Sequence, residues 1–197
     1  MELVFIIIIF LYSVIAHEVA HGKMAEYLGD PTARYMGRLT LNPIPHLDPI
    51  GSILLPLLLV VTNSPILFGW AKPVPYNPYN LRNQHYGNAM VAGAGVGTNL
   101  ALAIGVGLIM RLLPLEGAIL EILAYVVRIN LILGIFNLVP IPPLDGSKVL
   151  FDFFPHTDLI IFLERYGFFL LILFLLFGLP YLFPIINFLF KFIIGVY

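Results

Sequence analysis

Cysteine is absent from this chain of 197 residues, and charged side chains are scarce, at 11% of the composition. The lack of cysteine excludes a disulfide framework, a thiolate metal site and a cysteine nucleophile. The net charge of −1 offers no basic surface of the kind that binds nucleic acid. Apolar side chains, in contrast, make up 60% of the residues, and the mean hydropathy is +0.97. Soluble domains are about half apolar and a quarter charged, so the composition predicts an integral membrane protein.

Long apolar runs predict the membrane-crossing elements. We expect an all-α multi-pass membrane protein with about five or six transmembrane helices of about 20 residues each. Gly29 and Pro31 are expected to end the first helix, because neither residue continues a helix well. The apolar runs lie at about 3–27, 48–70, 88–112, 117–138, 159–178 and 181–196.

Two segments depart from the helical pattern. Residues 32–46 contain a short run of β-forming residues and Gly37, which predicts a small membrane-associated β-hairpin. The run at 48–70 is apolar but is interrupted by Pro56 and Pro65, so it suits a re-entrant segment if protein covers the freed backbone groups. The distribution of basic residues favours the re-entrant course over a complete crossing, and both courses stay open from the sequence.

The first apolar run contains the sequence "HEVAH", in which His17, Glu18 and His21 form an H-E-x-x-H pattern. On a helix the two histidines lie one turn apart on one face, so both imidazoles can reach one metal ion. Glu18 is placed to act on water as a general acid/base and not as a ligand. Zinc at such a site activates water for attack on a peptide carbonyl. The alternative is a set of polar residues at a helix end among lipid headgroups, but ionisable groups in a membrane segment indicate function by default.

Catalytic zinc usually has three protein ligands and one water, so two histidines leave the site one ligand short. The strongest candidate for the third is Asp145, in the sequence "NLVPIPPLDG". The prolines prevent a regular helix before Asp145, and Gly146 permits a turn. On its own Asp145 would be taken for the N-cap of a helix that starts at Gly146. Beside an H-E-x-x-H pattern that lacks a third ligand, the metal role is favoured.

His46 and Asp48, in "NPIPHLDP", have two interpretations of equal weight. They could orient the metal ligands or line a water path, as groups around metal sites do. They could equally be interfacial polar residues that cap a helix beginning at Pro49. The sequence does not decide between these roles.

Three motifs in order, "HEVAH", "GVGTN" and "NLVPIPPLDG", resemble those of the site-2 protease family of intramembrane zinc metalloproteases, also called peptidase M50. The stretches "LTLNPIPHLDPIGSILLP" and "FGWAKPVPYNPYNLRN" resemble a compact prokaryotic branch of that family, without a PDZ domain or fused regulatory domains. The resemblance implies a single membrane-embedded metalloprotease domain over residues 1–197. Its catalytic core is expected at about 3–150 and its C-terminal helices at about 157–197.

The resemblance also implies the roles of individual residues. His17, His21 and Asp145 are expected to bind one zinc ion per chain, with Glu18 as the general acid/base. Asn137 is expected to line the site and to donate a hydrogen bond to the substrate or the developing oxyanion. Asn99, at the end of "GVGTN", is expected to pack near the site. The implied partners are the lipid bilayer and transmembrane protein substrates, cut in or near their membrane segments, and the implied location is the cell membrane.

Two functions from other classes stay open. A transporter of divalent metal would also place histidines and acids near the middle of the membrane. It would have no special need for Glu18 beside the histidine pair. The second alternative is a catalytically silent pseudoprotease that binds transmembrane helices without cutting them. The complete set of His17, Glu18, His21 and Asp145 argues against this second alternative.

Overall fold

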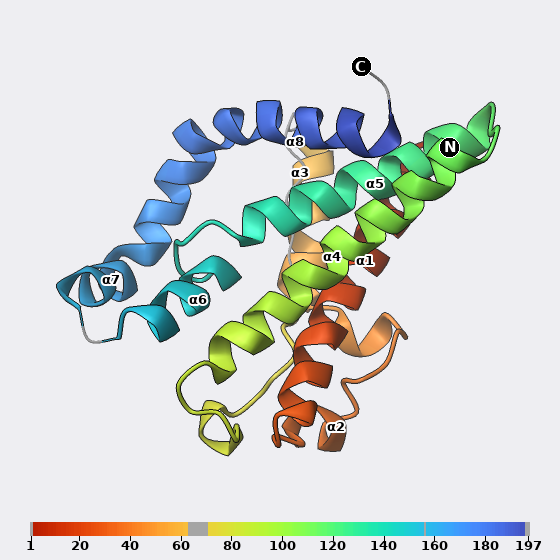
Figure 1. The fold of residues 1–197 in the computed structure, drawn as a ribbon. Helices are drawn as coiled ribbons and strands as arrows, with labels where there is room; N and C mark the ends of the chain where they lie inside the picture. The colour runs from red at the N-terminus through yellow and green to blue at the C-terminus, as the bar shows by residue number, and fades with distance from the viewer. Residues whose placement is uncertain (1, 63–70, 156, 196–197) are drawn as a thin grey trace.

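The computed structural model describes residues 2–62, 71–155 and 157–195, and within these ranges all regular structure is helical (Figure 1). Four helical stretches are long and apolar enough to cross a membrane: Glu2–Tyr27, Gly87–Leu112, Ala118–Asn137 and Asp158–Ile194. The first three are α1, α4 and α5. The fourth contains α7, Asp158–Leu173, and α8, Leu179–Ile194. The prediction of an all-α protein is therefore confirmed for the described residues, and their four candidate spans are roughly consistent with the five or six expected.

Helix α1 ends where the sequence predicts. The backbone N–H of Gly29 donates to Glu26 O at 3.0 Å, and that of Asp30 donates to Ala25 O at 2.9 Å. Gly29 has a φ of +111°, in the region that favours glycine. This pairing of bonds is a Schellman motif, which satisfies carbonyls that the helix end would leave free.

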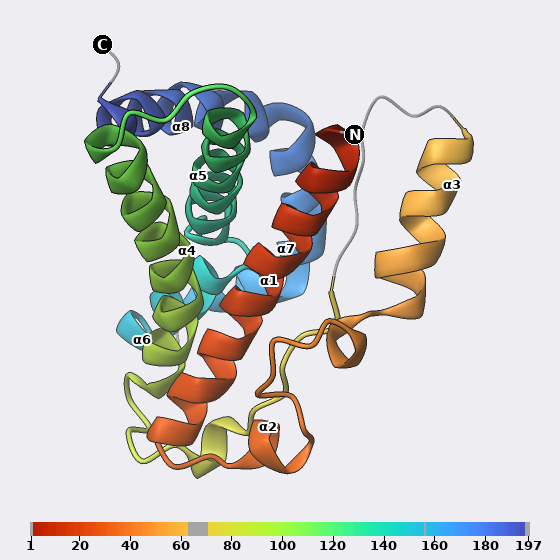
Figure 2. The same cartoon turned by 90° about the vertical axis from the view of Figure 1, so that its right-hand side faces the viewer.

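Helix α4 packs against α1, α5, α8 and the short α6, Asp145–Phe153 (Figures 1 and 2). Many of its residues are glycine or alanine, which lets neighbouring helices approach closely in lipid. Exposed leucine, isoleucine and phenylalanine side chains cover the outer faces of α1 and α7. Such a surface suits contact with lipid chains. A core cluster joins α4, α5 and α8 through the buried residues Ala103, Val127, Leu131 and Ile186.

Helices α7 and α8 were expected as two separate spans, but they form one helical run of 37 residues. A π-helical stretch, η4 at Phe174–Gly178, joins them. Proline stands at the start of α8 and inside it, at Pro180 and Pro184, where prolines bend helices. Figures 1 and 2 show α8 lying across one end of the bundle, over the ends of α4 and α5.

The β-hairpin predicted at 32–46 is wrong. The segment contains a helical turn, α2 at Thr32–Tyr35, and a 3-10 turn, η1 at Ile44–His46. Pro43 and Pro45 lack the N–H groups that a β-ladder needs. The segment is held to the chain after residue 70 by the Arg38 guanidinium, which donates to Lys72 O at 2.6 Å and to Pro73 O at 3.2 Å, and by the Lys72 N–H, which donates to His46 O at 2.9 Å.

The segment 48–70 begins with two consecutive apolar helices, η2 at Pro49–Leu54 and α3 at Leu55–Val61. Their six and seven residues span roughly 20 Å at 1.5 Å per residue, short of the roughly 30 Å apolar core of a bilayer. Figure 2 shows α3 apart from the bundle of α1, α4 and α5. Residues 63–70 lie outside the described ranges, so the re-entrant course of 48–70 stays a prediction.

A buried carboxylate holds the end of α1 to the loop before α4. Asp30 is fully buried and accepts hydrogen bonds from the Thr32 hydroxyl at 2.6 Å, the Asn77 N–H at 2.7 Å and the Asn80 amide at 2.8 Å. Burial alone would raise the pKa of Asp30, but the hydrogen bonds from Thr32, Asn80 and Asn77 outweigh it and lower the pKa. The ionised carboxylate is therefore the form that stabilises this junction.

Replacing Asp30 with asparagine is expected to lower the free energy of unfolding at pH 7 by about 2–3 kcal/mol, because the new NH₂ group faces donors. For a chain of this size the shift in Tm is roughly 5–10 °C, measured by thermal unfolding in detergent. Because folding lowers the pKa of Asp30, its contribution is complete above about pH 4 and is lost as the pH falls through the folded-state pKa. The two proteins should therefore converge in acid. Asp158→Asn, at an exposed position, is the control, and an equal loss there would contradict the prediction.

Candidate metal centre

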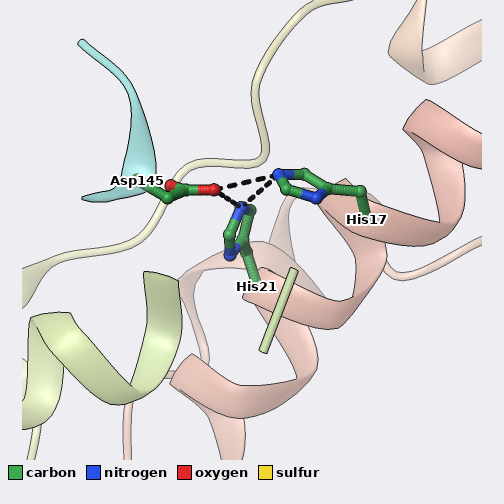
Figure 3. Close-up of side chains that lie close together, drawn as sticks. All are labelled: His17, His21 and Asp145. Atoms are coloured by element: carbon green, nitrogen blue, oxygen red, sulfur yellow. Dashed lines mark hydrogen bonds and ion pairs between the residues drawn. The ribbon is translucent and has the colours of Figure 1, made fainter. Parts of the chain in front are cut away.

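His17 and His21 lie one turn apart on α1 and are both buried, with 6% of each residue exposed. Their Nε2 atoms approach to 2.9 Å, and the ring planes meet at 84°. Figure 3 shows the two imidazoles converging with the Asp145 carboxylate. The sequence spacing alone predicts this arrangement, since positions i and i+4 share a helix face.

Asp145 comes from a distant part of the sequence, as the first residue of α6. Its Oδ2 atom lies 3.0 Å from Nε2 of His17 and 3.0 Å from Nε2 of His21. The start of α6 is fixed against the end of α5, because a Cβ on Gly146 would lie 2.7 Å from Val139 O and closer still to the carbonyl of Leu138. This close packing holds the start of α6 in place, and the Asp145 carboxylate there points at the histidines, as the metal interpretation predicts.

The other ring nitrogens of the histidines have acceptors. Nδ1 of His21 lies 2.7 Å from the Val91 carbonyl oxygen, and Nδ1 of His17 lies 2.6 Å from Oδ1 of Asn99. A carbonyl oxygen accepts but cannot donate, so the ring proton of His21 lies on Nδ1. A carbonyl partner on one ring nitrogen is the usual way to direct the other toward a metal. Asn99 lies at the site, as expected from "GVGTN".

The three residues fit a zinc ion. Their ligand atoms lie within 4.8 Å of one another, and Asp145 Oδ2 is a buried atom without a hydrogen-bond partner. Zinc with bonds of about 2.0–2.1 Å separates tetrahedral ligand atoms by roughly 3.3 Å, close to the distances of 2.9–3.0 Å among these atoms. Lone pairs that converge without a shared proton repel one another, and a cation among them removes that repulsion. Two imidazoles and one carboxylate are a donor set that zinc uses in catalytic sites.

Gly95 of α4 forms the wall behind the imidazoles. A Cβ at this position would lie 2.5 Å from Nε2 of His21 and 2.8 Å from Cε1 of His17. Real Cβ atoms essentially never come that close to another heavy atom. The absence of a side chain at Gly95 therefore allows the two rings to occupy their positions.

Glu18 is half-buried beside the cluster, and its Oε2 accepts a hydrogen bond of 2.7 Å from the Val74 N–H. Lys148 of α6 donates to Asp145 Oδ1 at 2.9 Å. Burial would raise the pKa of Asp145, but the positive charge of Lys148 beside it acts in the opposite direction and favours the ionised carboxylate. Asp145 and Glu18 in turn outweigh the effect of burial on Lys148 and raise its pKa. The site therefore presents an ionised carboxylate as its third ligand candidate.

Other residues singled out from the sequence lie elsewhere. Asn137 is half-buried at the end of α5, and its amide donates to Leu133 O at 3.0 Å within the same helix, so its oxyanion role stays a prediction. Asp48 is the N-cap of η2, accepting from the N–H groups of Ile50 and Gly51 at 3.0 and 2.7 Å. His46 is fully buried as the last residue of η1, with Nε2 2.8 Å from Thr40 O.

Several residues at the site were not predicted from the sequence. Gly95 carries no distinct sequence signal because glycines in an apolar helix usually serve helix packing, and the Val74 amide has none because it is a backbone group. Ser13 and Asn130, which contact Asn99, were not singled out. Asn130 had a signal, since a buried amide in an apolar helix is costly without a partner.

Comparisons with known proteins identify the family of this chain. Residues 113–177, which include Asp145, match the model of peptidase family M50. YwhC of Bacillus subtilis (strain 168), named as a zinc metalloprotease, is 38% identical over 160 residues, which cover 77% of this chain and 69% of YwhC. Rip2 of Mycobacterium tuberculosis, also named as a zinc metalloprotease, is 32% identical over 151 residues, 75% of this chain and 57% of Rip2. No solved structure matches the chain. The identity to YwhC and the extent of the match show that this chain belongs to peptidase family M50, the site-2 protease family, and is a metalloprotease of that type.

Proposed function

We propose that this chain is an intramembrane zinc endopeptidase that hydrolyses peptide bonds in or near the transmembrane segments of other membrane proteins. The observation that carries the proposal is the buried convergence of His17, His21 and Asp145 beside Glu18, within a bundle of apolar helices. Membership in the site-2 protease family supports the same conclusion. Under this proposal the chain is a multi-pass protein of the cell membrane.

His17, His21 and Asp145 would hold the zinc ion, one per chain. When bound, zinc supplies a Lewis acid that activates water and polarises the scissile carbonyl. Glu18 takes the proton from the attacking water and delivers it to the leaving amine. The Val74 N–H holds one Glu18 oxygen in place, and the other oxygen serves the proton transfer. Asn137 donates to the developing oxyanion or to the substrate.

The metal-transporter alternative has weaker support. A transport path needs a succession of ligand groups across the membrane. Among the described residues, His17, His21 and Asp145 form the one group of three that could hold a metal ion. The pseudoprotease alternative has no need of Glu18. The substrate class under the proposal is a membrane protein whose transmembrane helix unwinds near the site, because helical hydrogen bonds otherwise protect the peptide bonds.

Zinc removal tests the proposal. Membranes from cells that produce the chain are expected to accumulate new protein termini within transmembrane segments, as mapped by mass spectrometry. Treatment with 1,10-phenanthroline should stop this accumulation, and added zinc should restore it, since the chelator removes the metal ion that the three ligands would hold. The purified protein should contain one zinc ion per chain by elemental analysis.

His21→Ala should lose both the zinc and the new termini. His85→Ala, which removes an exposed histidine outside the cluster, is the matched control and should keep both. Zinc-independent cleavage, or a full zinc content in His21→Ala, would overturn the assignment of the site.

A further inference from the structure

Three buried polar side chains connect α1, α4 and α5 inside the membrane-crossing bundle: Ser13, Asn99 and Asn130. Asn99 and Asn130 are at most 1% exposed and Ser13 is 5% exposed. Two buried amides in lipid-embedded helices are costly unless every donor and acceptor has a partner. Their hydrogen bonds lead to His17, and the direction of each bond decides which ring nitrogen of His17 carries the proton.

The amide of Asn130 has a fixed orientation. Its nitrogen donates to the Val126 carbonyl at 2.9 Å and to the Ser13 hydroxyl at 2.9 Å. A backbone carbonyl only accepts, so the Asn130 nitrogen must face Val126 and cannot exchange places with the oxygen. The oxygen of Asn130 is thereby directed at Asn99, which lies 2.8 Å away.

The amide of Asn99 is fixed by the same reasoning. Its nitrogen donates to the Asn130 oxygen at 2.8 Å and to the Ser13 carbonyl at 3.2 Å, two atoms that only accept. Its oxygen must then face Nδ1 of His17, at 2.6 Å. Because that oxygen also only accepts, the proton on this side of His17 belongs to Nδ1. The lone pair of Nε2 is left facing His21 and Asp145.

We infer that Asn130 is a positioning residue which, by fixing the orientation of the Asn99 amide, holds the proton of His17 on Nδ1 and so directs Nε2 to the metal. The inference rests on the proposed zinc site. His21 needs no orienting side chain, because the Val91 backbone carbonyl accepts from its Nδ1 directly. Of the two histidines, His17 alone depends on a side-chain amide that could turn over, and Asn130 makes the shorter of the two hydrogen bonds that prevent this, the Ser13 carbonyl making the other.

The test uses three variants of the full chain, purified in detergent. Asn130→Leu removes the group that orients Asn99 while keeping the side-chain volume. Asn130→Asp keeps an acceptor for Asn99, and in its protonated form it also keeps a donor for Val126. Ser13→Ala breaks another bond of Asn130 but leaves the Val126 contact that fixes its orientation. If Asn130 acts by orienting Asn99, zinc binding should weaken in the leucine variant alone. If it acts only through packing, the loss of zinc affinity in each variant should follow the loss of Tm.

Two readouts are needed. The zinc dissociation constant, from competition with a chelator of known affinity, is expected to rise about 10- to 100-fold in Asn130→Leu. It should stay within about threefold of wild type in the other two variants, which is below that range. Nitrogen-15 NMR of histidine-labelled protein, without zinc at pH 8, should place the His17 proton on Nδ1 in wild type and on both nitrogens in Asn130→Leu.

A wild-type zinc constant together with an unchanged His17 spectrum in Asn130→Leu would overturn the inference, as would a wild-type His17 protonated only on Nε2. If Asn130→Leu fails to fold, Asn130→Ala removes the same amide without added branching and is scored in the same way. Failure of wild type to bind zinc would overturn the proposed metal site, while the NMR spectra still decide the orientation of His17.

Discussion

Glu18→Gln is expected to lower the rate of peptide hydrolysis by about 10²- to 10⁴-fold, the usual contribution of a general acid/base, while the protein keeps its fold and its zinc. The amide of glutamine has nearly the shape of the carboxylate, and its oxygen can accept the Val74 N–H that Glu18 now accepts. Glutamine cannot take a proton from water at neutral pH. The variant therefore separates the chemical step from metal binding.

The measurement compares cells that produce the wild type with cells that produce Glu18→Gln, and maps new termini in the membrane fraction by mass spectrometry. Termini within transmembrane segments that occur only with the wild type would establish the protease and identify its substrates. Zinc content, determined on both purified proteins, is the control for the integrity of the site. Identical termini in the two samples, with zinc in both proteins, would favour the pseudoprotease or the transporter, and metal flux would be measured next.

Much of the fold follows from local features of the sequence. The apolar runs predict the long helices, and the Gly29–Pro31 pair predicts the end of α1, because hydropathy and chain stereochemistry act over a few residues. The hairpin prediction at 32–46 failed for a reason of the same kind. Its β-forming residues were given more weight than Pro43 and Pro45, which cannot donate to a ladder.

The candidate site also has a part that the sequence predicts and a part that it does not. His17, Glu18 and His21 share one helix, so their spacing predicts their geometry, and Asp145 follows from the need for a third ligand. The contacts of Gly95, Asn130 and Val74 depend on how α4, α5 and the loop before α4 are rotated and shifted against α1. No local pattern contains that information. Periodicity places Gly93, Gly95 and Gly97 on α4, but only the packed structure shows which of them faces the imidazoles.

Gly95→Ala is expected to weaken zinc binding by about 100-fold, at the upper end of the effects seen when groups around a metal site are altered. The new methyl group would lie 2.5 Å from Nε2 of His21. Relief requires the rings to move, which breaks the Nδ1 bonds to Val91 or Asn99, or requires α1 and α4 to separate. Overpacking of this kind costs about 1–3 kcal/mol, so we expect a folded protein with a misplaced ligand pair.

Neighbouring glycines of the same helix supply the controls. A Cβ on Gly93 or Gly97 would meet nothing within 4 Å, so alanine there should leave zinc affinity and proteolysis at wild-type levels. Alanine is also about 0.8–1 kcal/mol more favourable than glycine in a helix interior, which makes these variants at least as stable. Zinc affinity from chelator competition and the Tm in detergent are measured on all three proteins. Equal zinc affinity in Gly95→Ala and the controls would mean that the rings have room to move, and that Gly95 serves helix packing and not the metal site.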